Sequence, residues 1–172
     1  MYNQIKTLKD EKVQKLFSDL GVFTPEEMDA RHEIELENYV MKIQIEARVL
    51  GDMLRNHVIP SAIKYQNELI DNVEGLKSVL GAAEGKKAAE TQLDFIKRIS
   101  NHINEMNSLI KKMIDERRKA NKIEDAEKKA EAYCDKVKVY FDEIRYHSDK
   151  LEITIDDQML PFPKLRELLF TR

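Results

Sequence analysis

Apolar residues recur every three or four positions along most of the chain, which is the spacing of an amphipathic helix. From residue 36 to residue 54 they step alternately by four and three residues, and beyond Pro60 a second series resumes this rhythm on a shifted phase. The first series comprises Leu36, Val40, Ile43, Ala47, Leu50 and Leu54. The pattern predicts one long helix over residues 25–80, about 80 Å long at about 1.5 Å per residue.

Local signals mark where this helix begins. Thr24 is placed to be the N-cap, Pro25 occupies the first helical position, and Glu27 lies three residues after Thr24. Threonine and glutamate at that spacing can each accept a hydrogen bond from the other's backbone N–H, which forms a capping box. A shorter helix over 4–20 is expected to precede it and to end at Gly21.

Pro60 interrupts the long pattern. Proline has no backbone N–H, and its ring clashes with the carbonyl of the residue four positions earlier, so a helix that contains it kinks or ends. No glycine or second proline accompanies Pro60. We expect a kink over residues 56–59, and an end of the helix there is the alternative.

Two more helices are predicted over 86–120 and 123–150, because each carries core-type positions that repeat every seven residues. The first contains Ile96, Ile99, Ile103, Met106, Ile110 and Met113. The second contains Ala130, Tyr133, Val137, Tyr140, Ile144, His147 and Leu151. The short corner at residues 121–122 requires the two helices to pack antiparallel.

The predicted fold class is therefore an all-α antiparallel bundle, a single domain over 1–172 built on the long kinked helix. A short C-terminal helix over 163–170 completes it. The two hairpin helices should be about 50 and 40 Å long, so we expect them to cover only residues 55–80 of the long helix. Its first half then needs another partner, which the N-terminal helix and the tail could supply in part.

Composition narrows the range of functions. The 172 residues include only 5 Gly and 4 Pro, too few for a turn-rich sheet fold, and no glycine-rich phosphate-binding motif occurs. The 29 basic and 32 acidic residues nearly balance, so we expect no nucleic-acid and no membrane partner. The N-terminus lacks the apolar run of a signal peptide, and no window is apolar enough for a membrane span. We expect a cytoplasmic protein.

Candidate catalytic or metal-binding residues are few. A di-iron bundle needs Glu-x-x-His pairs, and no glutamate lies three residues before any of the 4 histidines. We expect His147 to be partly buried with a hydrogen-bond partner and His57 to serve the irregular turn near Pro60. Cys134 is expected to be a packed thiol. The basic residues of 111–129 alternate with carboxylates and should form a solvated, ion-paired tip. No catalytic, cofactor-binding or metal-binding residue is predicted.

Two blocks of the sequence resemble the type III glutamine synthetases. The first block spans residues 31–76, and its matching segments are 35–39, 44–48, 56–60 and 65–67. The second block, 156–170, is similar to the C-terminal signature of that family, which usually has Trp at the position of Leu160 and often Tyr at that of Leu165. The resemblance extends over nearly the whole chain and is least specific over 80–130.

The resemblance implies a function that the residues alone do not show. Such enzymes condense glutamate and ammonia to glutamine with ATP and Mg²⁺ or Mn²⁺, and their catalytic residues lie upstream on a sheet-based domain. The chain therefore looks like the C-terminal helical domain of such an enzyme without its catalytic domain. The resemblance implies a role in the contacts between subunits of stacked rings, with no cofactor in this part. The isolated chain is expected to have no ligase activity.

Two apolar surfaces, on residues 31–54 and 159–170, are expected to dock on the catalytic domain or on neighbouring subunits. Their side chains are Leu36, Val40, Ile43, Leu50, Leu54, Met159, Leu160, Phe162, Leu165, Leu169 and Phe170. Two alternatives stay open. One is a free-standing helical protein-protein interaction module, and the other is a small di-iron bundle enzyme that would hold metal. The uncovered stripe could also pair two copies of the chain as a homodimer.

Overall fold

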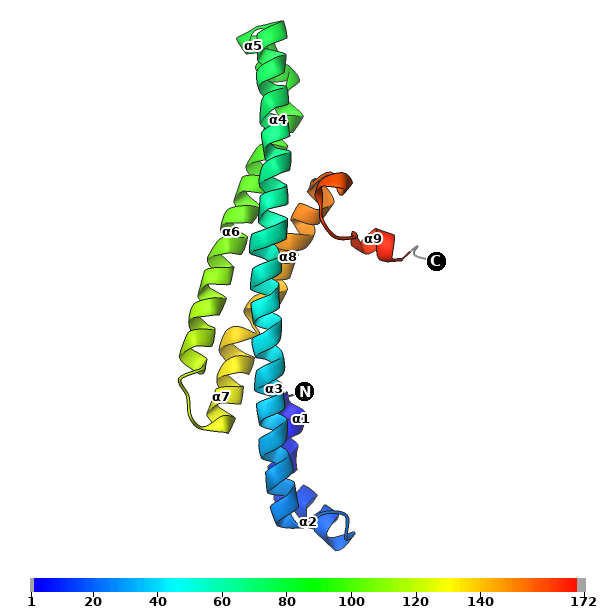
Figure 1. Cartoon of the computed structure of the whole chain (residues 1–172), viewed down its shortest axis with the longest axis vertical. Helices are drawn as coiled ribbons and strands as arrows, with labels where there is room; N and C mark the ends of the chain where they lie inside the picture. Colours follow the sequence, from blue (N-terminus) through cyan, green and yellow to red (C-terminus); the bar gives the residue numbers. More distant parts are fainter. Residues whose placement is uncertain (1, 170–172) are drawn as a thin grey trace. The chain divides into compact units, whose positions relative to one another are not determined.

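Helices make up most of the chain that the structure describes. The computed structural model describes residues 2–169, with all side chains in that range except those of residues 165 and 166. Its α-helices are α1 (Tyr2–Lys6), α2 (Glu11–Asp19), α3 (Pro25–Met53), α4 (Ile59–Leu80), α5 (Ala82–Ala88), α6 (Glu90–Ala120), α7 (Ala126–Ala132), α8 (Tyr140–Thr154) and α9 (Leu165–Leu168) (Figure 1). Turns of π-helix occupy Leu54–Val58 and Tyr133–Val137, and 3-10 turns occupy Thr7–Lys9 and Asp157–Met159. The described residues contain no strand, so the all-α fold class is confirmed.

The chain folds as two compact units. Unit 1 contains the chain up to Val49 together with Lys111–Phe141, and unit 2 contains Leu50–Ile110 together with the chain from Asp142 onward. Each unit therefore joins segments that lie far apart in the sequence. Within the described range, none of the helices is long and apolar enough to cross a membrane.

The predicted capping box opens α3. The Thr24 N–H donates to Glu27 Oε2 at 2.8 Å, and the Glu27 N–H donates to Thr24 Oγ1 at 3.2 Å. Gly21 has the positive φ of +65° that the preceding turn requires. These contacts satisfy backbone donors that the first turn of a helix otherwise leaves without a partner.

The single helix predicted over 4–20 is wrong, because Asp10 interrupts it. The backbone of Asp10 is extended, and its carboxylate accepts a hydrogen bond from the Lys12 N–H at 2.9 Å. Aspartate favours this capping arrangement over a position inside a helix. The segment accordingly forms α1, a 3-10 turn and α2.

The helix predicted over 25–80 continues through Pro60. Helix α3, the π turn and α4 follow one another without a break, and the Ile59 N–H donates to the carbonyl of Leu54, five residues earlier. A π turn holds one residue more than an α turn, and it lies just before the proline, whose ring and missing N–H disturb the α-helical pattern. The irregularity expected over 56–59 is therefore this π turn.

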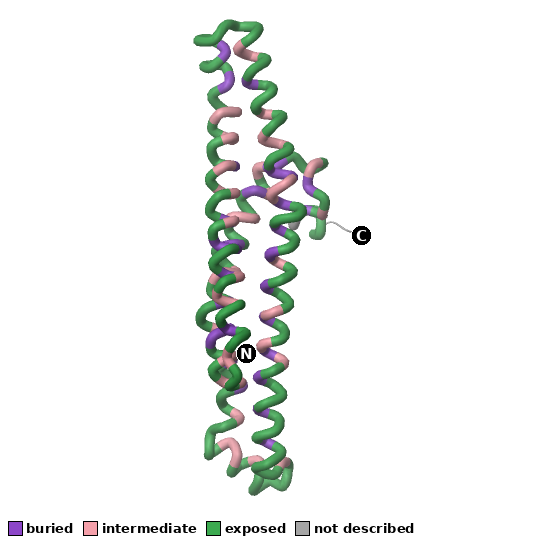
Figure 2. The backbone as a smooth tube through the Cα atoms, turned by 60° about the vertical axis from the view of Figure 1, so that its left-hand side comes forward, coloured by how far each residue is buried: buried purple, intermediate pink, exposed green. Residues whose placement is uncertain are grey.

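Most heptad positions of the predicted hairpin are confirmed as core, while Ile96, Ile103, Tyr140 and His147 are half-buried. Figure 2 shows buried residues recurring along the helices between exposed ones. Nine of the predicted positions are fully buried at 0% exposure, namely Ile99, Met106, Ile110, Met113, Ala130, Tyr133, Val137, Ile144 and Leu151. The second helix begins at Ala126 rather than residue 123, because Asp125 caps it by accepting a hydrogen bond from the Lys128 N–H at 2.8 Å.

Part of the hairpin covers the first half of the long helix inside unit 1, which corrects the expectation that the hairpin reaches only residues 55–80. Leu36 of α3 and Ala126 of α7 line the same hollow. On α1, the Tyr2 ring stacks on that of Tyr39 with centroids 5.6 Å apart. The expectation failed because residues 111–141 of the hairpin pack with residues 1–49 in the same unit.

The tip of the hairpin at 111–129 is ion-paired, as predicted. Arg118 lies 3.6 Å from Asp115, and Lys119 lies 2.6 Å from Glu116. These side chains are mostly exposed, so each pair contributes at most about 1 kcal/mol to stability.

Candidate docking surfaces

Helix α3 carries an exposed apolar stripe on the side away from its buried face. Ile34, Met41, Ile45 and Val49 are each 50–55% exposed. At about 100° per residue, these four positions project opposite to Leu36 and Ile43, which are buried. We call the four side chains the α3 stripe. Several exposed apolar side chains on one face of a helix are typical of an interaction site.

The docking side chains predicted on 31–54 lie on the other face of the long helix. Leu36, Ile43 and Leu54 are buried, while Val40 and Leu50 are half-buried. Because the chain itself covers them, they offer little free surface, and their docking role stays a prediction. The α3 stripe was missed, although its spacing of seven, four and four residues is visible in the sequence.

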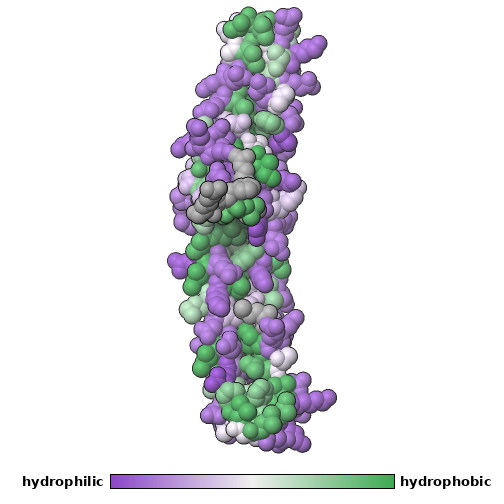
Figure 3. All heavy atoms as spheres, turned by 90° about the vertical axis from the view of Figure 1, so that its right-hand side faces the viewer, coloured by the Kyte–Doolittle hydropathy of each residue, from purple (hydrophilic) through white to green (hydrophobic). Residues whose placement is uncertain are grey.

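A second exposed apolar cluster lies at the end of α2. Leu16, Leu20 and Val22 are more than half exposed, and Figure 3 shows an apolar group at the lower end of the molecule. The same segment carries the half-buried Phe17 and Phe23, whose ring centroids are 5.8 Å apart. We call these five side chains the α2 cluster.

The predicted tail surface lies partly against its own unit. Leu160 is buried, and Met159 and Phe162 are half-buried. The Phe162 ring lies edge-on to that of His57, with centroids 5.8 Å apart. Leu169 is 74% exposed. The Leu165 side chain and Phe170 lie outside the described residues.

Lys164 anchors this tail and was not anticipated from the sequence. Its side chain is 92% buried, its Nζ donates to the Ile155 carbonyl at 2.7 Å, and it lies 2.6 Å from Asp157. A buried ammonium requires partners of this kind. The Lys164 N–H also donates to Glu167 Oε2 at 3.0 Å at the start of α9.

His147 has the hydrogen-bond partner predicted for it. Its Nδ1 lies 2.9 Å from Nδ1 of His102, and both residues are half-buried in unit 2. One ring must donate and the other accept, so both nitrogens cannot carry protons in this arrangement. Burial lowers the pKa of His102, and the neighbouring His147, Lys150 and Arg98 lower it further.

Because of the His102–His147 pair, we expect the folded chain to lose stability in mild acid. The pKa of His102 is lower in the folded chain than its usual value of about 6.5, so the unfolded chain binds more protons between the two values. The free energy of unfolding should therefore fall as the pH drops from about 6.5 through the lowered pKa. Urea titrations at a series of pH values should show this fall in the wild type and a shallower one in His102→Asn. Equal slopes would contradict the assignment.

Unit 1 buries three polar groups that have no hydrogen-bond partner among the described residues, the hydroxyls of Tyr2 and Tyr39 and Nε2 of His32. Burial raises the pKa of Tyr39, and the neighbouring half-buried Cys134 raises it further. Burial lowers the pKa of His32, and the positive charge of the nearby Lys9 lowers it further. The burial of these groups favours their neutral forms.

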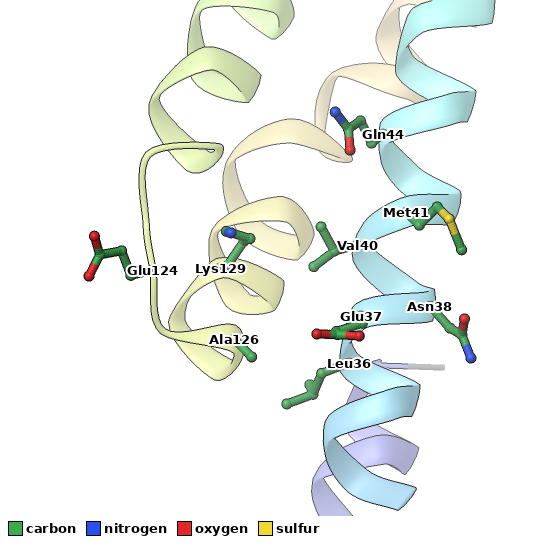
Figure 4. Close-up of a pocket in the computed structure, with 9 residues that line it drawn as sticks. All are labelled: Leu36, Glu37, Asn38, Val40, Met41, Gln44, Glu124, Ala126 and Lys129. Atoms are coloured by element: carbon green, nitrogen blue, oxygen red, sulfur yellow. The ribbon is translucent and has the colours of Figure 1, made fainter. Parts of the chain in front are cut away.

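Helices α3 and α7 border a hollow of about 400 Å³ in unit 1 (Figure 4). The apolar Leu36, Val40 and Ala126 and the charged Glu37 and Glu124 line it. A second hollow of about 340 Å³ adjoins it, because both are lined by Leu36 and Ala126. We call the two hollows together the α3–α7 groove. No group of three metal-ligating side chains that could hold an ion occurs in the described part of the chain.

The described residues form an all-α domain. Some of its large apolar side chains are exposed rather than covered by other parts of the domain. A family model described as "Glutamine synthetase C-terminal domain" matches residues 1–77. Over 151 residues, the chain is 42% identical to the glutamine synthetase of Bacteroides fragilis, and over 164 residues it is 30% identical to that of Butyrivibrio fibrisolvens. It is 25% identical to the type-3 glutamine synthetase of Dictyostelium discoideum over 168 residues. Residues 1–77 thus match the glutamine synthetase C-terminal domain family, and the similarity to proteins named glutamine synthetase extends over most of the chain.

These matches confirm the resemblance carried by residues 31–76 and 156–170. They cover 88%, 95% and 98% of this chain, but only 21%, 23% and 23% of the three relatives. The chain therefore spans about a fifth of the length of the curated relatives that it matches.

Proposed function

We propose that this chain is a non-catalytic accessory and assembly domain of a cytoplasmic glutamine synthetase. Its three relatives named glutamine synthetase extend well beyond the matched part. In this proposal the rest of such a polypeptide binds glutamate, ammonia, ATP and Mg²⁺ or Mn²⁺ and makes glutamine. The helical part presents surfaces to the catalytic domain and to neighbouring subunits.

The α3 stripe is the observation that carries this proposal. The stripe holds four large apolar side chains, each at least half exposed to water. Covering them with another apolar surface would be favourable, because it would remove apolar area from water. Full burial of one such side chain contributes about 1.5–3 kcal/mol. The stripe would equally suit a free-standing interaction module, but the greater length of the relatives favours a domain that docks within a larger enzyme.

Charges placed on the stripe should impair assembly without unfolding the domain. Ile34→Glu with Ile45→Glu, introduced into a glutamine synthetase that carries this domain, should shift the oligomer to smaller species by light scattering, because two carboxylates would have to be desolvated at the contact. Circular dichroism of the isolated variant chain should match the wild type, since both positions are exposed.

Val79→Glu with Ile153→Glu is the matched control, because these side chains are 82% and 78% exposed and lie outside the stripe. The control should leave the oligomer intact. An unchanged oligomer in the stripe variant would refute the proposed assembly role, as would an equal loss in both variants.

A further inference from the structure

The floor of the α3–α7 groove is apolar. Leu36, Val40 and Ala126 line it, and Figure 4 shows them pointing toward the space between the two helices. Leu36 is buried, whereas Val40 and Ala126 are half-buried. The groove borders α3 from Asp29 to Gln44, a distance of about 22 Å at about 1.5 Å per residue.

The rims of this groove are acidic on both sides. The carboxylates that line it are Asp29, Glu33, Glu37, Glu124, Asp125 and Glu127, and the amines are Lys9 and Lys129. The whole chain is nearly balanced, with 29 basic and 32 acidic residues, so this excess of carboxylates is local.

Three of the rim carboxylates are available to a partner. Glu33, Glu37 and Glu124 are exposed and form no ion pair with any described residue. By contrast, Glu127 already lies 3.7 Å from Lys9. Unpaired carboxylates on both rims favour a cationic occupant, which they would attract and orient.

His32 provides an independent reason to expect a ligand. It lines the second hollow, it is only 2% exposed, and its Nε2 has no hydrogen-bond partner among the described residues. A buried polar nitrogen without a partner costs free energy. A neutral imidazole can accept a hydrogen bond there from the N–H of an incoming lysine or arginine.

We propose that the α3–α7 groove binds a basic amphipathic helix, with its apolar side chains on the floor and its lysines and arginines between the acidic rims. A helix of about 15 residues matches the length of the groove. Binding of an apolar helix face in a hydrophobic groove is a common mode of recognition, and the rim charges select the sign of the partner. Met41 belongs both to the lining of the groove and to the α3 stripe, but Ile34 and Ile45 do not line the groove, so variants at these two positions test the stripe separately.

Three synthetic peptides of about 15 residues serve as probes for the full 172-residue chain. The first places leucines on one face and lysines on the other, the second replaces the lysines by glutamates, and the third has the composition of the first without its amphipathic order. Fluorescence anisotropy should show the first binding at least about tenfold more tightly than either of the others. Its affinity should also fall as salt is added.

Charge variants locate the contact. Glu37→Gln with Glu124→Gln should weaken binding of the leucine–lysine peptide about tenfold, and Glu37→Lys with Glu124→Lys should shift preference to the leucine–glutamate peptide. Glu26→Gln with Glu46→Gln is the matched control, because these exposed glutamates lie outside the groove lining. It should change the affinity less than about twofold.

Other outcomes would overturn the proposal. Equal binding of the ordered and disordered leucine–lysine peptides would show general charge attraction, and equal weakening by both glutamine pairs would place the contact elsewhere. Absence of binding by the first peptide would also refute the proposal. None of these results bears on the stripe variants, whose readout is the oligomeric state of the enzyme.

Discussion

Replacement of Tyr133 by alanine is expected to lower the free energy of unfolding of the chain by about 3–5 kcal/mol, the usual cost of removing a large buried aromatic side chain. Tyr133 is fully buried in the π turn Tyr133–Val137. Its hydroxyl donates to Oδ1 of Asn121 at the corner of the hairpin. The substitution therefore leaves a cavity in unit 1 and removes the contact that joins the π turn to the corner.

Tyr133→Phe separates these two effects, because it keeps the ring and removes only the hydroxyl. We expect a loss of about 0.5–1.5 kcal/mol, the net contribution of one hydrogen bond. Urea denaturation followed by circular dichroism measures both variants. A loss below about 1 kcal/mol for Tyr133→Ala would be far less than a buried aromatic side chain contributes, and it would contradict the burial of the side chain.

The second large effect is expected at Gly85 in unit 2, where α5 crosses the backbone of α4. A Cβ atom at Gly85 would meet Cα of Lys77 and lie 2.7 Å from the Leu76 carbonyl oxygen. Backbone atoms cannot move aside as the end of a flexible side chain can, so Gly85→Ala should force the two helices apart. We expect a net loss of about 1–3 kcal/mol, as for other overpacked sites, measured as the free energy of unfolding in urea.

Gly75→Ala is the matched control in the same unit. Gly75 lies inside α4, and a Cβ there would meet no atom within 4 Å. Alanine is a better helix former than glycine by about 0.5–1 kcal/mol, so this variant should be more stable than the wild type. Destabilisation of equal size in both variants would show that close approach at Gly85 is not the cause.

The helical fold was predictable because its signals are local or periodic. The capping box at Thr24 and Glu27 depends only on residues three apart, and the seven-residue repeat identified core positions such as Ile99 and Ile144. The disturbance near Pro60 follows from the chemistry of one residue. None of these inferences requires knowledge of which helices meet.

The features that could not be predicted depend on contacts between distant segments. Leu36 belongs to the apolar series over residues 36–54, and such a series looks the same in the sequence whether the chain itself or another protein covers it. The spacing therefore could not show that Leu36 is only 2% exposed. Lys164 gains its partner Ile155 only through the fold of the tail. The close approach of Gly85 to α4 is likewise a property of helix packing that a single glycine in the sequence does not show.

Hydroxyl-radical footprinting can show whether the α3 stripe is covered in a glutamine synthetase that carries this domain. The isolated chain and the whole enzyme are exposed to the same radical dose, and oxidation is measured at Ile34 and Ile45, each 55% exposed here. Val79, 82% exposed, serves as the reference for an exposed side chain, and Met106, fully buried, as that for a protected one.

We expect the two stripe residues to be oxidised readily in the isolated chain and at least about tenfold more slowly in the enzyme, because docking excludes water from the contact. Val79 should react equally in both samples. Equal oxidation of Ile34 and Ile45 in the isolated chain and in the enzyme would contradict the assembly role.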